Sequence, residues 1–161
     1  RERCGIPMDR DGELASRAKP RLSIVAQVLA NSFFDEPAPK SLDRFDIKLP
    51  AVEDLGTEEG AATLTHLTAA CIARALQHCP APPRELLITG GGRHNRVLVG
   101  MIEQETGVNV RSVDDLGWHG DAVEAQAFAY MAVRSVRGLP ITFPGTTGVR
   151  EPLTGGRLAN P

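Results

Sequence analysis

Three consecutive glycines followed by a polar turn are the feature of this sequence that most suggests ligand binding. Gly90-Gly91-Gly92-Arg93-His94-Asn95 follows a short apolar run and precedes a helical pattern. In such a turn, backbone amides and a helix N-terminus can approach phosphate or ribose without interference from Cβ atoms. The segment matches neither the dinucleotide-binding nor the Walker consensus. A glycine-rich turn that Asn95 merely caps explains the spacing equally well.

A second segment places two acids at the start of a helical pattern. Asp121 and Glu124 are the only acids in the otherwise apolar stretch 121–137. Because they are three residues apart, they lie on one face of the helix. The same spacing is typical of a capping box, in which the acids only satisfy free backbone amides. This capping interpretation is stronger for Asp121 than for Glu124.

Other catalytic or metal-binding patterns are weak. The cysteines are odd in number and lack Cys-x-x-Cys spacing, so they favour neither a disulfide framework nor a zinc site. Cys71 is expected to be a small core residue. Lys40, in the proline-rich loop 35–41, could meet a phosphate or a carboxylate, although a solvated lysine is the simpler interpretation. Exposed or capping roles are favoured for the scattered histidines, which are His66, His78, His94 and His119.

The first half of the chain predicts two helices. Apolar residues at helical spacing predict a helix over 22–31, and two prolines exclude a helix through 35–41. A longer helix is predicted from an N-cap at Thr57 to about His78, with Glu58 and Glu59 in its first turn. Its expected apolar stripe is Leu64, Leu67, Cys71 and Ala75.

The second half predicts the elements that must position the glycines and the acids. A buried strand over 85–89, a helix over about 95–106 and a strand over about 109–113 form a strand-helix-strand unit, which is normally parallel. The helix over 121–137 has ten hydrophobic residues among the twelve of 122–133. It is therefore expected to be buried on nearly all sides. The tail is expected to be loop with at most a short extended piece.

Composition limits the class of protein. The chain has 161 residues, 42% of them hydrophobic, which suits one domain, alone or with an attached segment, and argues against disorder. Eighteen basic against twenty acidic residues give a net charge of −2, which provides no electrostatic reason to expect nucleic acid or an anionic membrane as partner. Without a long apolar span or signal-peptide pattern, we expect a soluble, cytoplasmic protein.

Several segments together resemble one known family. They are 37–41 (Pro-Ala-Pro-Lys-Ser), 62–69, 88–95 with the glycines, 117–130 with both acids, 138–140 (Gly-Leu-Pro) and 147–148 (Thr-Gly). In order and spacing they are similar to the carboxyl-terminal part of anhydro-N-acetylmuramic acid kinase. The resemblance spans nearly the whole chain.

The resemblance implies an α/β fold, a partial lobe of the sugar kinase and actin-like ATPase fold that is helix-rich with a short, mostly parallel sheet. Residues 1–50 would be a helical entry segment with a proline-rich loop, and 51–161 the carboxyl-terminal part of the second ATPase-like lobe. The reaction uses ATP, Mg²⁺ and water to convert anhydro-N-acetylmuramic acid to N-acetylmuramic acid 6-phosphate in cell-wall recycling. Gly90, Gly91, Gly92 and Asn95 would lie along the nucleotide, and Glu124 would face the sugar.

Two segments typical of this family do not occur in the 161 residues. They are a Gly-Thr-Ser-Met-Asp-Gly phosphate loop and an Asp-Thr-Gly-Pro-Gly-Asn segment whose aspartate is the expected general base. Glu124 cannot simply replace them, because a base must reach the proton it removes and the phosphate must be held in line. We therefore expect a kinase portion that needs its amino-terminal lobe, is inactive alone and can form a homodimer. The alternative is a non-catalytic nucleotide-binding or interaction module derived from the same lobe.

Overall fold

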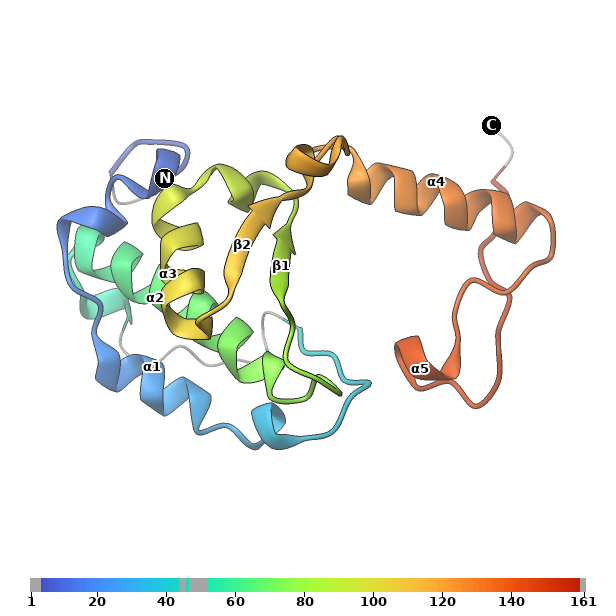
Figure 1. Cartoon of the computed structure of the whole chain (residues 1–161), viewed down its shortest axis with the longest axis horizontal. Coiled ribbons are helices and arrows are strands. Elements are labelled where there is room, and N and C mark those ends of the chain that lie inside the picture. Colours follow the sequence, from blue (N-terminus) through green and yellow to red (C-terminus); the bar gives the residue numbers. More distant parts are fainter. Residues whose placement is uncertain (1–3, 44–45, 47–51, 160–161) are drawn as a thin grey trace.

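The computed structural model describes residues 4–43, 46 and 52–159. Five helices and two strands occur in these ranges, joined by short 3₁₀ turns (Figure 1). They are α1 (Leu22–Leu29), α2 (Thr57–Leu76), β1 (Glu85–Ile88), α3 (Arg96–Thr106), β2 (Asn109–Ser112), α4 (Val123–Val136) and α5 (Pro144–Thr147). The sequence predicts the first six in this order. The single turn of α5 lies in the tail that was expected to be loop, and the Thr142–Leu153 bridge is the short extended piece.

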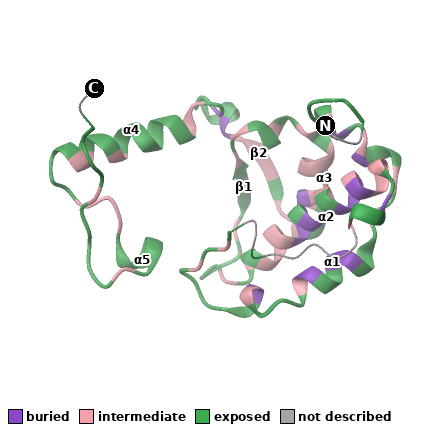
Figure 2. Cartoon of the chain, turned by 180° about the vertical axis from the view of Figure 1, so that it is seen from behind, coloured by how far each residue is buried: buried purple, intermediate pink, exposed green. Residues whose placement is uncertain are grey.

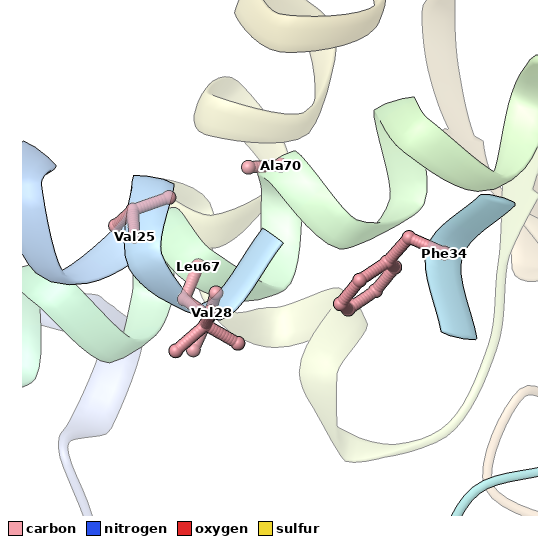
Figure 3. Close-up of a cluster of buried hydrophobic side chains, with 5 residues drawn as sticks. All are labelled: Val25, Val28, Phe34, Leu67 and Ala70. Atoms are coloured by element: carbon pink, nitrogen blue, oxygen red, sulfur yellow. The ribbon is translucent and has the colours of Figure 1, made fainter. Parts of the chain in front are cut away.

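The main hydrophobic core lies between α1 and α2. Val25 and Val28 of α1 pack with Leu67 and Ala70 of α2, and the ring of Phe34 closes the cluster (Figure 3). Cys71 is half-buried and packs against this cluster, in agreement with its expected place beside the core. Burial also raises the pKa of its thiol.

The apolar stripe expected on α2 is partly wrong. Leu64 is 39% exposed and Ala75 is exposed, whereas Leu67 is only 7% exposed. The buried face is made instead by small residues and one leucine: Gly60, Ala62, Thr63, Leu67, Ala69 and Ala70. Small side chains lie where α1 and α3 approach closely, so hydrophobicity alone does not identify the face.

The start of α2 also differs from expectation. Thr57 is already helical, and Gly56 is the N-cap without a side-chain hydrogen bond. Glu58 and Glu59 do lie in the first turn, and Glu59 accepts a 2.9 Å hydrogen bond from the Arg21 side chain. The helix start is therefore stabilised by its carboxylates rather than by a threonine cap.

Strands β1 and β2 are parallel, with Glu85 opposite Asn109 and Ile88 opposite Ser112. Helix α3 connects them, which confirms the predicted strand-helix-strand unit. Gly107, with φ of +67°, ends α3 in the left-handed conformation that glycine tolerates best. Exposed and half-buried residues alternate along β1, so the expectation of a buried strand is wrong. Within the described residues, the sheet consists of these two strands, and each strand pairs only with the other.

Helix α4 projects from the rest of the fold, and α5 and the tail lie beyond it (Figure 1). None of its residues is buried, so the expectation of a helix buried on nearly all sides is wrong (Figure 2). Phe128, Tyr130, Val133 and Val136 are each more than half exposed. The apolar composition of α4 indicates a need for packing partners, but the described chain does not supply them.

The architecture confirms an α/β chain that is rich in helix and has a short parallel sheet. The expected boundary between residues 50 and 51 lies outside the described residues. Across the described ranges, no helix combines the length and apolar character that crossing a membrane requires.

Candidate nucleotide and sugar site

The glycine segment forms a tight turn between β1 and α3. Gly90 has φ of +72°, which a residue with a side chain rarely adopts, and Gly91–His94 form a 3₁₀ turn. Asn95 then caps α3, because its Oδ1 accepts a 2.9 Å hydrogen bond from the Leu98 amide. The capping interpretation of Asn95 is thus confirmed. The contact that the resemblance implies between Asn95 and nucleotide stays a prediction.

The outer side of this turn is open. A methyl group placed on Gly90 or Gly91 would meet no atom within 4 Å. Gly91 and Gly92 are exposed, and their amides form no hydrogen bond with any residue that the structure describes. Two free amide donors on an uncrowded backbone can bind an anionic group such as a phosphate.

Arg93 joins the glycine turn to the residues before α4. Its side chain is only 5% exposed. Nη2 donates to Asp121 Oδ2 at 2.8 Å, and Nε donates to Asp114 Oδ2 at 2.6 Å. Nη1 donates to the Gly90 carbonyl oxygen at 3.0 Å and to the second oxygen of Asp121. The two segments singled out in the sequence therefore meet at one guanidinium, near the start of α4.

Gly120 lies at the centre of this junction and is buried. Its amide donates to Asp114 Oδ1 at 2.8 Å. Its carbonyl oxygen accepts from the Gly90 amide at 3.1 Å and from Thr89 Oγ1 at 2.9 Å. A methyl group at Gly120 would lie 2.4 Å from Arg93 Nε, so a glycine is required for the guanidinium to pack on this backbone.

The junction brings one positive and two negative side chains together. The hydrogen bond from Arg93, followed by those from the Gly120 amide and the Ser112 hydroxyl, holds the pKa of Asp114 well below its usual range. The hydrogen bond from Arg93 also lowers the pKa of Asp121. Asp121 and then Asp114 raise the pKa of Arg93. All three groups therefore stay charged around neutral pH.

The capping-box interpretation of the two acids is wrong. The N-cap of α4 is Ala122, and no side chain caps this helix. Asp121 instead binds Arg93 with both oxygens, because a guanidinium matches a carboxylate better than a single amide does. Glu124 lies in the first turn of α4 and is exposed, with no hydrogen bond or ion pair to another described residue.

The interpretation of Lys40 as a solvated lysine is wrong. Nζ donates to the carbonyl oxygens of Phe33 at 2.6 Å and Phe34 at 3.1 Å, and lies 3.3 Å from His78 Nε2. The ammonium also lies 4.8 Å from the centre of the Phe33 ring. These contacts fold the proline-rich loop back onto the end of α2.

The proline-rich loop also meets the tail. Pro39, Lys40 and Ser41 line a pocket of about 150 Å³ together with Thr146 and Thr147. A methyl group on the following Gly148 would lie 3.3 Å from Pro39 Cγ. The segments 37–41 and 147–148, which both belong to the family resemblance and lie far apart in the sequence, are thus in contact.

The histidines form no site of their own. His94 and His119 are exposed, as expected, but His66 and His78 are half-buried. His66 lies 3.7 Å from Glu105, and His78 Nε2 lies 2.7 Å from the Phe34 carbonyl oxygen. Within the described ranges, no three His, Cys, Asp or Glu side chains gather as a metal site requires.

Sequence reasoning missed the roles of Arg93, Asp114 and Gly120. Arg93 stands within the glycine motif, but nothing in the local pattern indicates that its side chain is buried. Asp114 follows β2 in the 3₁₀ turn Val113–Leu116 and is one of two neighbouring acids there. The useful signal was the position of both motifs after parallel strands, because such strands end at the same edge of a sheet.

Comparison with known proteins identifies the class of protein. A family model described as anhydro-N-acetylmuramic acid kinase matches residues 1–160. The chain belongs to the anhydro-N-acetylmuramic acid kinase family, which confirms the resemblance seen in the sequence.

Curated relatives bear the same name. The anhydro-N-acetylmuramic acid kinase of Rhizorhabdus wittichii is 49% identical over 160 residues, which are 99% of this chain and 44% of that protein. That of Rhizobium rhizogenes is 47% identical over 152 residues, 94% of this chain and 41% of the relative. That of Rhodospirillum rubrum is 48% identical over 156 residues, 97% of this chain and 42% of the relative. The chain thus spans less than half the length of these relatives.

Proposed function

We propose that this chain forms the carboxyl-terminal part of a kinase that converts anhydro-N-acetylmuramic acid to N-acetylmuramic acid 6-phosphate in the cytoplasm, during cell-wall recycling. The observation that carries this proposal is the junction at Arg93. It holds an open glycine turn against the start of α4, where Glu124 lies, in a chain of this kinase family. The lobe would have the sugar kinase and actin-like ATPase fold, of which the strand-helix-strand unit is a part.

The glycine turn fits a nucleotide. Gly91 and Gly92 are exposed, their amides are unused by other described residues, and a methyl group on Gly90 or Gly91 would meet no atom within 4 Å. When bound, ATP supplies the phosphoryl group. Gly90, Gly91 and Gly92 would lie along it, and the Asn95 side chain would keep the turn fixed by capping α3.

The described residues do not fit a Mg²⁺ site. Mg²⁺ in kinases is usually held by one or two carboxylates together with substrate phosphates. The two carboxylates that meet the glycine segment, Asp114 and Asp121, are both bound by Arg93. The metal ligands would therefore come from elsewhere in the complete kinase.

Glu124 would face the sugar. In the reaction of this family, water opens the 1,6-anhydro ring while O6 becomes phosphorylated. The family segment with the expected general base does not occur in the 161 residues. Glu124 would contact sugar hydroxyls or polarise the water, a role suited to a charged group without a structural partner.

Product formation tests the proposal directly. A full-length kinase carrying this segment should form N-acetylmuramic acid 6-phosphate from ATP and the anhydro-sugar, detected by mass spectrometry. The 161-residue chain by itself should form none, because the groups that hold the phosphates in line and activate water are proposed to lie in the other lobe. Product from the chain alone above a no-protein control would contradict the proposal that these groups lie in the other lobe. Absence of product from the full-length kinase would contradict the function.

The nucleotide contact can be tested with two matched glycine substitutions. Gly91→Ala adds a methyl group on the side where the nucleotide is proposed to lie, so in the full-length kinase it should raise KM for ATP several-fold more than KM for the sugar. Gly100→Ala adds the same group to an open position of α3 and should change neither. Equal KM values for ATP in the wild type and a folded Gly91→Ala variant would contradict the nucleotide contact and mean that the glycine segment is a structural turn.

A further inference from the structure

We propose that Arg93 is a positioning residue that holds the glycine turn and the first turn of α4 in one fixed geometry, so that nucleotide and sugar contacts are set together. This inference rests on the proposed function.

The contacts of Arg93 lie on three separate segments. Asp114 follows β2, Asp121 precedes α4, and the Gly90 carbonyl oxygen belongs to the glycine turn itself. Asp114 and Asp121 lie 21 and 28 residues after Arg93 in the sequence. A side chain that served only its own turn would not need partners at the ends of two other elements.

The junction leaves little room for rearrangement. The Arg93 side chain is 5% exposed, and Gly120 packs so closely against it that a methyl group would clash at 2.4 Å. Gly120 is hydrogen-bonded through its amide to Asp114 and through its carbonyl oxygen to Gly90. Displacing the guanidinium therefore displaces the residues directly before α4.

The start of helix α4 is attached to the rest of the fold at this junction, whereas the tail beyond α4 contacts the proline-rich loop. None of the residues of α4 is buried within the described chain, and the helix projects from the end of the sheet (Figures 1 and 2). Glu124 lies three residues after Asp121, in the first helical turn. The contacts of Arg93 thus act on the residues that lead directly into the helical turn of Glu124.

Arginine is the side chain that this arrangement requires. Its planar fork of five donors can bind two carboxylates and a carbonyl oxygen at once, whereas lysine provides a point charge on a flexible stem. Arg93→Lys therefore keeps the charge and loses the geometry. The exposed pair of Arg111 and Glu85, 3.3 Å apart in the same sheet, offers a matched control in Arg111→Gln.

Amide hydrogen exchange of the 161-residue chain tests the positioning without any activity. In Arg93→Lys, the Gly90 and Gly120 amides should exchange at least tenfold faster, while Arg111→Gln leaves both within twofold of the wild type. Unchanged exchange at both glycines in Arg93→Lys overturns the inference. If circular dichroism shows that Arg93→Lys is unfolded, Asp121→Asn, which keeps shape and removes one carboxylate charge, carries the same test.

Kinetics of a full-length kinase with this segment test the functional consequence. Arg93→Lys should raise KM for both ATP and the anhydro-sugar at least threefold and lower kcat at least tenfold. Both KM values and kcat within twofold of wild type, in a variant with faster exchange, would reduce Arg93 to a structural residue and overturn the inference. A wild-type kinase without product would instead contradict the proposed function, and the exchange measurement would still decide whether Arg93 fixes the turn.

Discussion

Arg93 and Glu124 show two opposite ways in which a charged residue can be placed. Arg93 is enclosed, and each hydrogen bond that its side chain donates goes to a carboxylate or a carbonyl oxygen. Glu124 is exposed and has no partner among the described residues. The family resemblance is the reason for proposing that Glu124 faces the sugar, and a charge that the fold does not use is available for that role.

Glu124→Gln tests this role. If the carboxylate contacts sugar hydroxyls or water in a closed cleft, loss of a charge-assisted hydrogen bond should reduce turnover of the full-length kinase by roughly tenfold to a hundredfold. The melting temperature should stay within a few degrees, because Glu124 forms no structural contact in the described chain. Asp115→Asn, at an exposed acid of the neighbouring 3₁₀ turn, is the control and should keep wild-type turnover. If Glu124→Gln also keeps wild-type turnover, the proposed contact between Glu124 and the sugar or water is wrong.

At the scale of elements, the packing of α2 is the clearest departure from the sequence pattern. The leucines at 64 and 67 are expected on one apolar stripe, yet only Leu67 enters the core between α1 and α2. The helix turns its small residues toward its neighbours, because close approach of helices depends on side-chain size as well as on polarity.

Two leucine truncations on α2 therefore give unequal losses of stability. Leu67→Ala should lower the free energy of unfolding by about 2–5 kcal/mol, since it leaves a cavity in the core. Leu64→Ala should cost about 1 kcal/mol or less, because its side chain is substantially exposed. Urea unfolding of the chain, followed by circular dichroism, measures both. Equal losses would mean that the two leucines are equally buried.

At the scale of the whole molecule, the apolar surface of α4 lies outside the core formed by α1 and α2 (Figure 2). Phe128 and Val136 are 61% and 76% exposed. Exposed apolar patches of this kind promote association. In the complete kinase, the amino-terminal lobe is proposed to cover this apolar surface. For the 161-residue chain by itself, a second copy of the chain is proposed to cover it.

The 161-residue chain should therefore self-associate. Light scattering should give a mass that rises with concentration, and the double variant Phe128→Lys with Val136→Lys should shift it toward the monomer. Gln104→Lys adds a charge at an exposed position of α3 and should leave association unchanged. A monodisperse monomer of the wild type over a wide concentration range would contradict this prediction.

The amino-acid sequence by itself determines the order of the elements and the location of the turns. Helical periodicity, glycines and prolines act over a few residues, and so do the hydrogen bonds that they favour. For this reason α1, α3 and the parallel unit around the glycines are predicted closely, and capping by Asn95, one of the two interpretations left open, is confirmed. The family, too, can be recognised from the order and spacing of its segments.

Only the tertiary structure decides what each side chain faces. The exposure of α4 depends on which partners reach it, which its own apolar residues do not reveal. The Arg93 junction joins residues 21 and 28 positions apart, and the clash that demands Gly120 exists only once they are in contact. Asp121 could bind a helix amide or a guanidinium, and the fold selects the guanidinium because it brings Arg93 to the end of the same sheet.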